Sequence, residues 1–231
     1  MANENDVQVD VVRVFTTPEG QLGNELGIIR ADEQTVGREQ SMAAALGFSE
    51  TVFIDDVTNG IARIRIFTPA TELPFAGHPS VGTAWWLREQ GTPVEVLAEK
   101  AGDVAVRYDG DVTWISAQAS WAPEFEWIEC ATPDELDALE PSSYIRGHHY
   151  AYTWIDEDAG RMRSRMFAPE MGILEDEATG AAAVRITDRL GRGLEITQGR
   201  GSRISTRLGS GGTAPDRMVQ VGGRTVFDRR M

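Results

Sequence analysis

The chain contains one internal repeat, and this repeat restricts its possible folds more than any other feature. Residues 65–69 (RIFTP) correspond to residues 165–169 (RMFAP), and residues 77–84 (GHPSVGTA) correspond to residues 175–182 (EDEATGAA). Each copy has the pattern of a strand, a loop and the first turn of a helix. A unit that recurs after about a hundred residues indicates two lobes of one plan, because solenoid repeats are shorter.

We therefore expect an N-terminal lobe over residues 1–118 and a C-terminal lobe over residues 119–231. The region 124–141, rich in Glu, Asp and Pro, lies near the expected boundary. The last strand is a candidate to return to the N-terminal lobe.

Hydrophobic periodicity and turn residues predict the individual elements of the fold. The alternating valines of residues 8–15 have the two-residue period of a strand with one buried face. Glycines at 47, 91 and 191 follow apolar stretches in the way that ends a helix. The sequence predicts helices over residues 35–46, 79–90 and 177–190, and further strands over residues 26–29, 51–54, 61–67, 94–97, 104–108 and 112–116.

Charge and cysteine content exclude several classes of function. With 22 Lys+Arg against 36 Asp+Glu, the formal net charge is −14, which repels nucleic acid and anionic lipid. Residues 161–231 are nonetheless net basic, and we favour pairing of this segment with the acidic remainder over binding of an anionic ligand. A single cysteine, Cys130, excludes an intrachain disulfide framework, and no Cys/His cluster has zinc-site spacing. The sequence thus predicts a cytoplasmic protein without a metal, a membrane span or a nucleic-acid partner.

A polar residue stands before each helix of the repeat, His78 before Pro79 and Asp176 before Glu177. Both have the sequence position of a helix N-cap. If the two helix N-termini face one cleft, their free N–H groups form a site that binds a carboxylate. Taken singly, Asp176 is better explained as a plain helix cap and His78 as a structural histidine of a loop.

Several motifs together give the chain a resemblance to a known family. They are FTP at 67–69, GHPSVGTA at 77–84, SET at 49–51, EDEATG at 175–180, and the Gln198-Gly199 pair. In their order along the chain they resemble the PhzF-like family of phenazine biosynthesis, over roughly residues 9–227.

The resemblance implies an α+β fold like that of diaminopimelate epimerase, with two similar lobes, each a curved, mostly antiparallel sheet wrapped around a central helix. It implies a cofactor-independent isomerase that acts on a small carboxylate-bearing substrate, and a homodimer. The glutamate of the SET motif, here Glu50, would move the proton, and His78 and Asp176 would line the same cleft as catalytic residues. A carboxylate suits this task when partial desolvation raises its pKa toward the working pH.

By the same resemblance, substrate-binding residues would lie beside these three groups: Asn24, Ser49, Gly77, Gly180 and Ala181.

Two departures from the family pattern concern the substrate. Family members commonly have Thr-Gly-Ser-Ala where this chain has Ala181 after Gly180, so one hydroxyl donor is missing, and Glu177 replaces a usual proline. Both changes favour a substrate other than the phenazine precursor. Two alternatives remain, a non-catalytic binding protein of the same fold and an epimerase of a small amino or hydroxy acid. A racemase with two catalytic thiols is disfavoured, because the one cysteine lies elsewhere.

Overall fold

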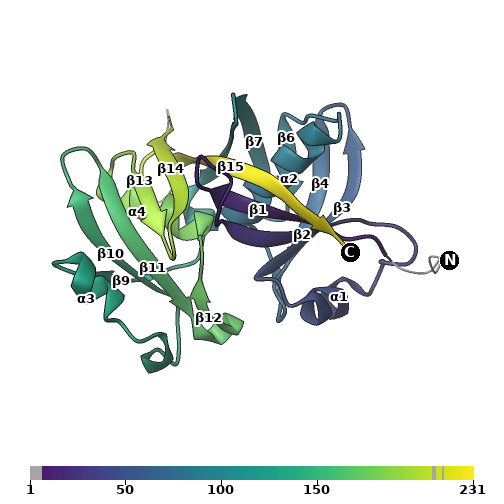
Figure 1. Cartoon of the computed structure of the whole chain (residues 1–231). Coiled ribbons are helices and arrows are strands. Elements are labelled where there is room, and N and C mark those ends of the chain that lie inside the picture. The colour runs from purple at the N-terminus through teal and green to yellow at the C-terminus, as the bar shows by residue number, and fades with distance from the viewer. Residues whose placement is uncertain (1–6, 210–211, 215) are drawn as a thin grey trace.

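The fold is dominated by β-structure (Figure 1). The computed structural model describes residues 7–209, 212–214 and 216–231. The strands are β1 (Asp10–Thr16), β2 (Asn24–Arg30), β3 (Glu50–Thr58), β4 (Ile61–Phe67), β5 (Glu72–Leu73), β6 (Val96–Glu99), β7 (Gly102–Asp109), β8 (Val112–Gln118), β9 (Glu126–Glu129), β10 (His149–Asp156), β11 (Arg161–Ala168), β12 (Ile173–Asp176), β13 (Glu195–Gln198), β14 (Ser202–Leu208) and β15 (Met218–Arg230). The α-helices are α1 (Glu39–Leu46), α2 (Gly77–Glu89), α3 (Pro133–Asp137) and α4 (Gly180–Leu190), and the 3-10 helices are η1 (Ala119–Trp121), η2 (Pro141–Ser143) and η3 (Pro169–Met171).

Hydrogen bonds join these strands into one mixed sheet along the path β1-β2-β3-β4-β6-β7-β8-β15-β14-β13-β11-β10-β9, with β5 on β4 and β12 on β11. Strands β2–β3, β4–β6, β9–β10 and β11–β13 pair in parallel, and the other pairs are antiparallel. A strand-rich fold with few helices is therefore confirmed. The two lobes that the sequence predicts are not separate sheets.

The repeat in the sequence is also a repeat of strand pairing. Strands β2 to β7 have the same order of parallel and antiparallel partners as strands β9 to β14. Figure 1 shows the two sets gathered on opposite sides of the molecule, with α2 and α4 in corresponding places.

Strand β15 joins the two sets. Its first part, from Met218 to Arg224, pairs with β8, and residues 219–222 also pair with β14 on the other side. Its second part, from Arg224 to Arg230, pairs with β1. The last strand thus pairs directly with β14 of the second set and is connected to the first set through β1 and β8, which pair with β2 and β7.

Helix α2 is buried on most of its faces, because its sequence is apolar or small almost throughout. It packs against β1, β2, β3, β8 and β15, whereas α4 packs against β14 and β15. Gly82 of α2 allows this helix to approach β1 and β2 closely, since a Cβ atom at Gly82 would lie 2.6 Å from Val14 and 2.7 Å from Leu26. Helix α4 has one buried face, formed by residues such as Ala183 and Ile186.

The ends of the helices were predicted better than their beginnings. Gly47 and Gly191 adopt left-handed conformations after α1 and α4, as expected. The predicted starts were wrong for α1, which begins at Glu39 instead of residue 35, for α2, which begins at Gly77 with Ala76 as N-cap, and for α4, which begins at Gly180 with Thr179 as N-cap. His78 consequently lies inside the first turn of its helix, and Asp176 is the last residue of β12 rather than a cap.

This result also changes the correspondence between the two copies. Pro69 and Pro169 are 100 residues apart, whereas the first helical residues, Gly77 and Gly180, are 103 apart. The second loop is therefore three residues longer, and the longer β12 lies within it. The residue that corresponds to His78 in the second helix is Ala181, not Asp176.

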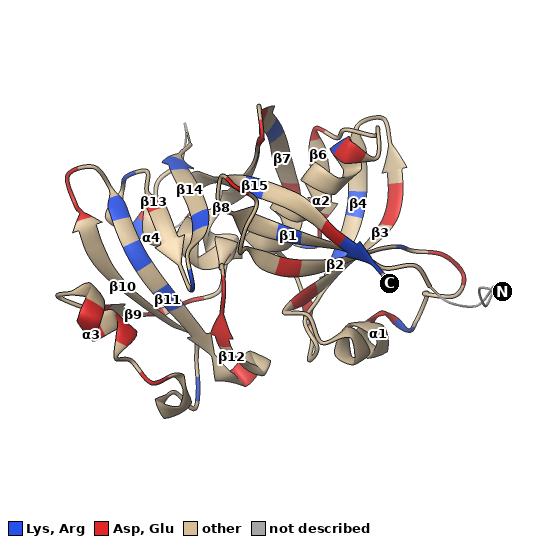
Figure 2. Cartoon of the chain, viewed as in Figure 1, with Lys and Arg blue, Asp and Glu red and all other residues tan. Residues whose placement is uncertain are grey.

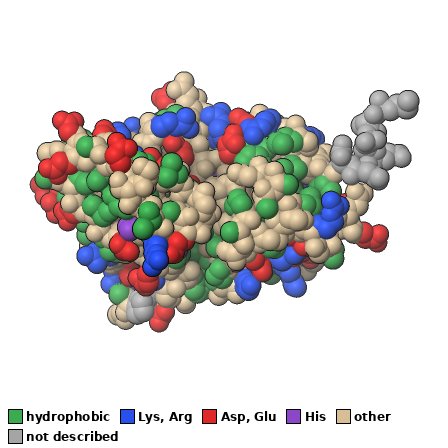
Figure 3. Space-filling view, turned by 90° about the horizontal axis from the view of Figure 1, so that it is seen from below, with side chains coloured by type: hydrophobic (Ala, Val, Ile, Leu, Met, Phe, Trp, Pro, Cys, Tyr) green, Lys and Arg blue, Asp and Glu red, His purple; other side chains and the backbone are tan. Residues whose placement is uncertain are grey.

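Acidic and basic residues are interspersed along the ribbon (Figure 2) and on the face seen in Figure 3. Basic residues of the late segment pair with acids of the earlier one, as the sequence predicted: Arg229 with Glu25, Arg230 with Asp10, Arg224 with Asp111, and Arg163 with Asp137. No helix within the described ranges combines the length and the apolar composition needed to cross a membrane.

Candidate active site

The N-termini of α2 and α4 meet at two glycines. A Cβ atom at Gly180 would lie 2.7 Å from the backbone nitrogen of His78, and one at Gly77 would lie 2.9 Å from the carbonyl carbon of Gly180. Neither glycine has a left-handed backbone conformation. Glycine is needed at both positions because the helices approach too closely to leave room for a Cβ atom. The two helix N-termini therefore lie at one place, as the repeat predicted.

Glu50 and His78 form a buried pair beside this contact. Glu50 is the first residue of β3, and its side chain is 12% exposed, against 3% for His78. The Nδ1 atom of His78 lies 3.0 Å from Oε2 of Glu50, whereas its buried Nε2 has no hydrogen-bond partner among the described residues. A neutral imidazole with its proton on Nδ1 donates to Glu50 without burying an unpaired N–H group at Nε2. This geometry holds Glu50 as an acceptor of one hydrogen bond.

Asp176 is the second buried carboxyl of the site. Its Oδ1 accepts a hydrogen bond of 2.6 Å from Nδ2 of Asn24, and its Oδ2 lies 2.5 Å from the hydroxyl of Thr179. Burial, followed by the negative charge of Glu50, raises the pKa of Asp176 to about 7, although the hydrogen bonds from Thr179 and Asn24 act in the opposite direction. Asp176 thus exchanges its proton near neutral pH.

Gln198, at the end of β13, fixes the turn between β12 and α4. Its Nε2 donates to the carbonyl of Asp176 at 3.0 Å and to the hydroxyl of Thr179 at 2.8 Å, and its Oε1 accepts from the amide of Thr179 at 3.2 Å. Since one side chain binds both residues, it sets the orientation of Asp176 relative to α4.

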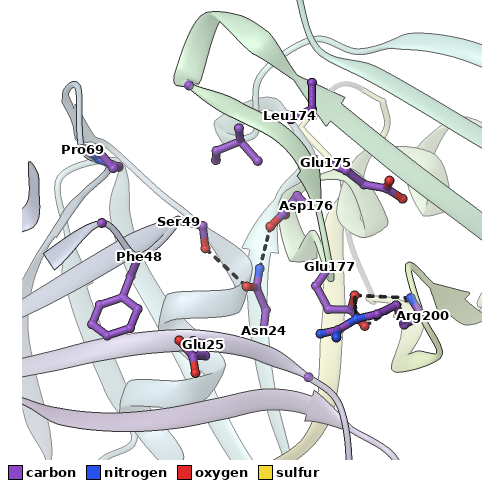
Figure 4. Close-up of a pocket in the computed structure, with 14 residues that line it drawn as sticks. Asn24, Glu25, Phe48, Ser49, Pro69, Leu174, Glu175, Asp176, Glu177 and Arg200 are labelled. Carbon is purple, nitrogen blue, oxygen red and sulfur yellow. Dashed lines mark hydrogen bonds and ion pairs between the residues drawn. The ribbon is translucent and has the colours of Figure 1, made fainter. Parts of the chain in front are cut away.

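Two cavities meet at Asp176. The inner cavity, of about 200 Å³, is mostly apolar and is lined by Glu50, Leu73, Pro74, Phe75, Ala76, Trp121, Pro123, Phe125, His148, Met166, Met171, Ile173, Asp176, Thr179 and Ala181. The outer cavity, of about 480 Å³, is more open and more polar (Figure 4). Asp176 and Ile173 line both. The inner cavity thus offers a small apolar space with two carboxyl groups in its wall.

A family model described as phenazine biosynthesis-like protein (PhzC-PhzF) matches residues 12–145, more than half of the chain. The chain belongs to this PhzF-like family. The resemblance found in the sequence is therefore confirmed.

Similar curated proteins carry an isomerase name. The trans-2,3-dihydro-3-hydroxyanthranilate isomerase of Pseudomonas aeruginosa is 32% identical over 219 residues, covering 77% of this chain and 78% of that protein. The enzyme of the same name from Pseudomonas fluorescens is 32% identical over 216 residues, with the same shares of both chains. This PhzF-like protein is accordingly an isomerase, as the sequence predicted.

Solved structures show the same fold. A PhzF family protein from Bacillus anthracis matches with a TM-score of 0.78 at 20% identity, over 97% of this chain and 98% of that one. A hydroxyproline epimerase from Agrobacterium vitis matches with a TM-score of 0.65 at 14% identity, over 100% and 93%. The PhzF-like fold is thus shared with epimerases.

The predicted site residues of this PhzF-like chain occupy three positions around the two cavities. Glu50, Asp176 and Ala181 line the inner cavity, and Asn24 and Ser49 line the outer one. The hydroxyl of Ser49 lies 3.4 Å from Oδ1 of Asn24, whose amide group contacts Asp176 (Figure 4). Gly77 and Gly180 form the helix contact behind Glu50, and His78 reaches the site through Glu50.

The extra negative charge that Glu177 brings is compensated in the structure. Its carboxylate lies 3.1 Å from Nε of Arg200 and accepts a hydrogen bond of 2.8 Å from the hydroxyl of Ser202. Glu177 therefore anchors the loop after β12 instead of adding an unpaired charge to the site (Figure 4).

Sequence reasoning missed Thr179 and His148, and it used Gln198 only as part of a motif. Thr179 was hidden inside a predicted helix, although a Thr before a Gly-Ala-Ala run is a typical N-cap. His148 belongs to none of the motifs on which the sequence analysis relied. The aromatic wall around Phe125 comes from the expected lobe boundary, where the composition suggested a linker.

Proposed function

We propose that this protein is a cofactor-independent isomerase in which Glu50 moves a proton on a small carboxylate-bearing substrate held in the inner cavity. One observation carries the proposal: a buried carboxylate, positioned by His78, faces an apolar cavity that contains a second carboxyl group, Asp176.

The proposed reaction is a proton shift without net oxidation. Glu50 accepts a proton from a substrate carbon, the electrons of the broken C–H bond form a new double bond, and the existing double bond moves along. The carbon at the far end then takes the proton back from Glu50. One carboxylate can serve both carbons if they lie on the same face of the substrate.

Within this proposal the other polar groups position the substrate and the base. The hydroxyl of Thr179 donates to Oδ2 of Asp176 and accepts from Gln198, so these two residues hold Asp176 in place at the cavity wall. Asn24 and Ser49 line the outer cavity, the path by which a substrate would approach. We further propose that residues 1–118 and 119–231 act as two lobes, each wrapped around its central helix, that close on the substrate.

The names of the curated relatives suggest the first substrate to test, trans-2,3-dihydro-3-hydroxyanthranilate. The experiment incubates this acid with the protein in deuterated water and follows deuterium incorporation and double-bond position by NMR. The native protein and Glu89→Gln, a surface change at the exposed end of α2, are expected to catalyse the shift. Exchange that persists in Glu50→Gln would overturn the role of Glu50.

Epimerisation is the second candidate, because Asp176 supplies another carboxyl group that exchanges its proton near neutral pH. Two-base epimerisation places deuterium at a stereocentre and inverts it, whereas the proposed isomerisation moves a double bond. Chiral chromatography of small amino and hydroxy acids after incubation in deuterated water separates the two reactions.

A homodimer remains a prediction of the family resemblance, as does a cytoplasmic location. Light scattering on the purified protein measures the first directly.

A further inference from the structure

Glu99 carries a buried carboxyl group that the proposed reaction does not use. It is the last residue of β6, and its Oε1 atom lies 2.5 Å from the hydroxyl of Ser80, near the start of α2. Its Oε2 atom is buried and has no hydrogen-bond partner among the described residues. A buried carboxylate oxygen without a partner is costly, whereas a protonated carboxyl group has no charge to solvate. The surroundings of Glu99 therefore favour its neutral form.

The hydroxyl of Ser80 gives a second reason for a neutral Glu99. Its Oγ atom also lies 2.7 Å from the carbonyl oxygen of Ala76, and a carbonyl can only accept. Because a hydroxyl has one proton, Ser80 can donate to Ala76 and keep its bond to Glu99 only if Glu99 donates. In line with this count, burial raises the pKa of Glu99 to about 8, although hydrogen bonds from Ser80 and the backbone of Ala76 act in the opposite direction. Glu99 thus holds its proton at neutral pH and releases it at mildly alkaline pH.

The described charged side chains beside Glu99 in the sheet point away from it. Arg63 of β4 and Asp103 of β7 pair with the residue before Glu99, so they lie on the opposite face of the sheet. Lys100, the next residue, is exposed and pairs with Glu72. An ionised Glu99 would therefore have no positive partner among these neighbours.

The start of α2 lies between Glu99 and Glu50. Ser80 bonds to Glu99, while His78, two residues earlier, lies 3.0 Å from Glu50. Side chains two positions apart are rotated by about 200° around a helix axis, nearly to opposite sides. Ala76, the N-cap of α2, lines the inner cavity, whereas Glu99 is not part of its described lining. The charge of an ionised Glu99 would thus lie beside the helix N-terminus, on the side away from Glu50.

We propose that Glu99 sets the affinity of the inner cavity for carboxylates: its neutral form leaves the positive end of α2 free to attract an anion, and its ionised form opposes that anion. A helix N-terminus attracts a carboxylate through its partial positive charge, which a negative charge nearby offsets. The ligand class is a small carboxylic acid, and Glu99 acts on its charge without touching it. This inference rests on the proposed function, because it takes the inner cavity as the place where the substrate carboxylate binds.

The test uses two stable probes of similar shape, anthranilate, which is an anion at both pH 6 and pH 9, and its uncharged amide, anthranilamide. Their dissociation constants are measured by titration calorimetry at these two pH values. The proteins are the native chain and two neutral variants, Glu99→Gln and Glu99→Met. Glu89→Gln is the matched control, because it makes the same chemical change at the far end of α2.

At pH 6 all four proteins should bind anthranilate alike, within about twofold. At pH 9 both neutral variants should bind it up to roughly tenfold more tightly than the native protein and the control, because Glu99 must first recover a proton about one pH unit above its pKa. Anthranilamide should bind all four alike at both pH values. Asp176 and Glu50 are present in every variant, so their own ionisation cancels in the comparison.

Three results overturn the proposal: neutral variants that bind anthranilate at pH 9 no more tightly than the native protein, a gain that anthranilamide shares, or a native protein that binds neither probe at pH 6. A shared gain would indicate that the substitution changes the shape of the cavity. Circular dichroism confirms that each variant is folded. Failure of the proposed function is a separate result, because it is an absence of Glu50-dependent proton exchange, which the binding constants do not measure.

Discussion

His78 contacts Glu50 through Nδ1 at 3.0 Å, although the two residues lie 28 positions apart on different elements. The contact joins the first residue of β3 to the first turn of α2. It holds one Glu50 oxygen, and the other is left to face the cavity. The pair therefore combines a fixed orientation with a free acceptor.

Glu50→Gln should abolish proton exchange while leaving the fold intact. Glutamine can still accept the hydrogen bond from His78, so the midpoint of thermal unfolding should shift little, but an amide cannot take up the proton. Loss of general base catalysis typically costs about 10²–10⁴-fold in rate. Deuterium incorporation into the dihydro-hydroxyanthranilate measures the rate, and calorimetry measures the unfolding midpoint.

Asp176→Asn should remove a pH-dependent loss of stability. The pKa of Asp176 is raised to about 7 in the folded protein, so the folded state holds the proton more tightly than the unfolded state does. Stability then falls as pH rises from about 4 to about 7. Urea unfolding of both proteins at pH 5 and pH 8 should show a smaller decrease in the free energy of unfolding for Asp176→Asn, and equal decreases would contradict the raised pKa.

Asn24→Ser should raise the pKa of Asp176 further. Asn24 donates to Oδ1 of Asp176 at 2.6 Å and thereby stabilises the ionised form. Without this bond Asp176 should keep its proton to higher pH, so the limb of the activity profile that reports its ionisation should move to higher pH. Ser49→Ala is the control, since Ser49 contacts Asn24 and, among the described residues, makes no hydrogen bond to Asp176. An unmoved limb in Asn24→Ser would show that this hydrogen bond does not tune the acid.

Gly180→Ala should separate the two helix N-termini. Its Cβ would lie 2.7 Å from the nitrogen of His78, a backbone atom that cannot rotate away. In an open helix the same change would stabilise the protein, so a net loss of about 1–3 kcal/mol measures the clash. Gly47→Ala, where no atom lies within 4 Å but φ is 72°, isolates backbone strain and should leave the proton shift intact.

Glu99→Gln should stabilise the protein at alkaline pH. The Oε1 atom of Glu99 lies 2.5 Å from the hydroxyl of Ser80, its Oε2 is buried, and burial raises its pKa to about 8. A protonated Glu99 donates to Ser80, whose hydroxyl then donates to the carbonyl of Ala76 at 2.7 Å. Glutamine preserves this neutral arrangement, so the variant should match the native protein near pH 6 and exceed it near pH 9 in urea unfolding.

Local signals in the sequence correctly predicted the helix ends that depend only on the backbone conformation of one glycine. Gly47 and Gly191 end their helices because glycine accepts a left-handed conformation at little cost. The predicted start of α4 was wrong because acidic residues before an alanine run resemble the first turn of a helix. In the fold, Glu177 is instead held by Arg200 and Ser202, and Gln198 binds the carbonyl of Asp176.

The candidate site was predictable only in part, for a similar reason. Motif resemblance identified Glu50, His78 and Asp176, and the structure brings them together. The cavity wall that contains Phe125 and His148 has no local pattern of its own, because it forms only when β9 pairs with β10. Long-range strand pairing of this kind leaves no short-range signal in the chain.

The pairing of β1 with β15 has a consequence for synthesis on the ribosome. The first and last strands in chain order lie side by side, with Asp10 opposite Arg230. Until β15 is made, the buried strand β1 has one unpaired edge, and the half of the fold around α2 lacks a strand against which that helix packs. A nascent chain therefore exposes the apolar edge of β1 until β15 has been synthesised, and this state is prone to aggregation and suited to chaperone binding.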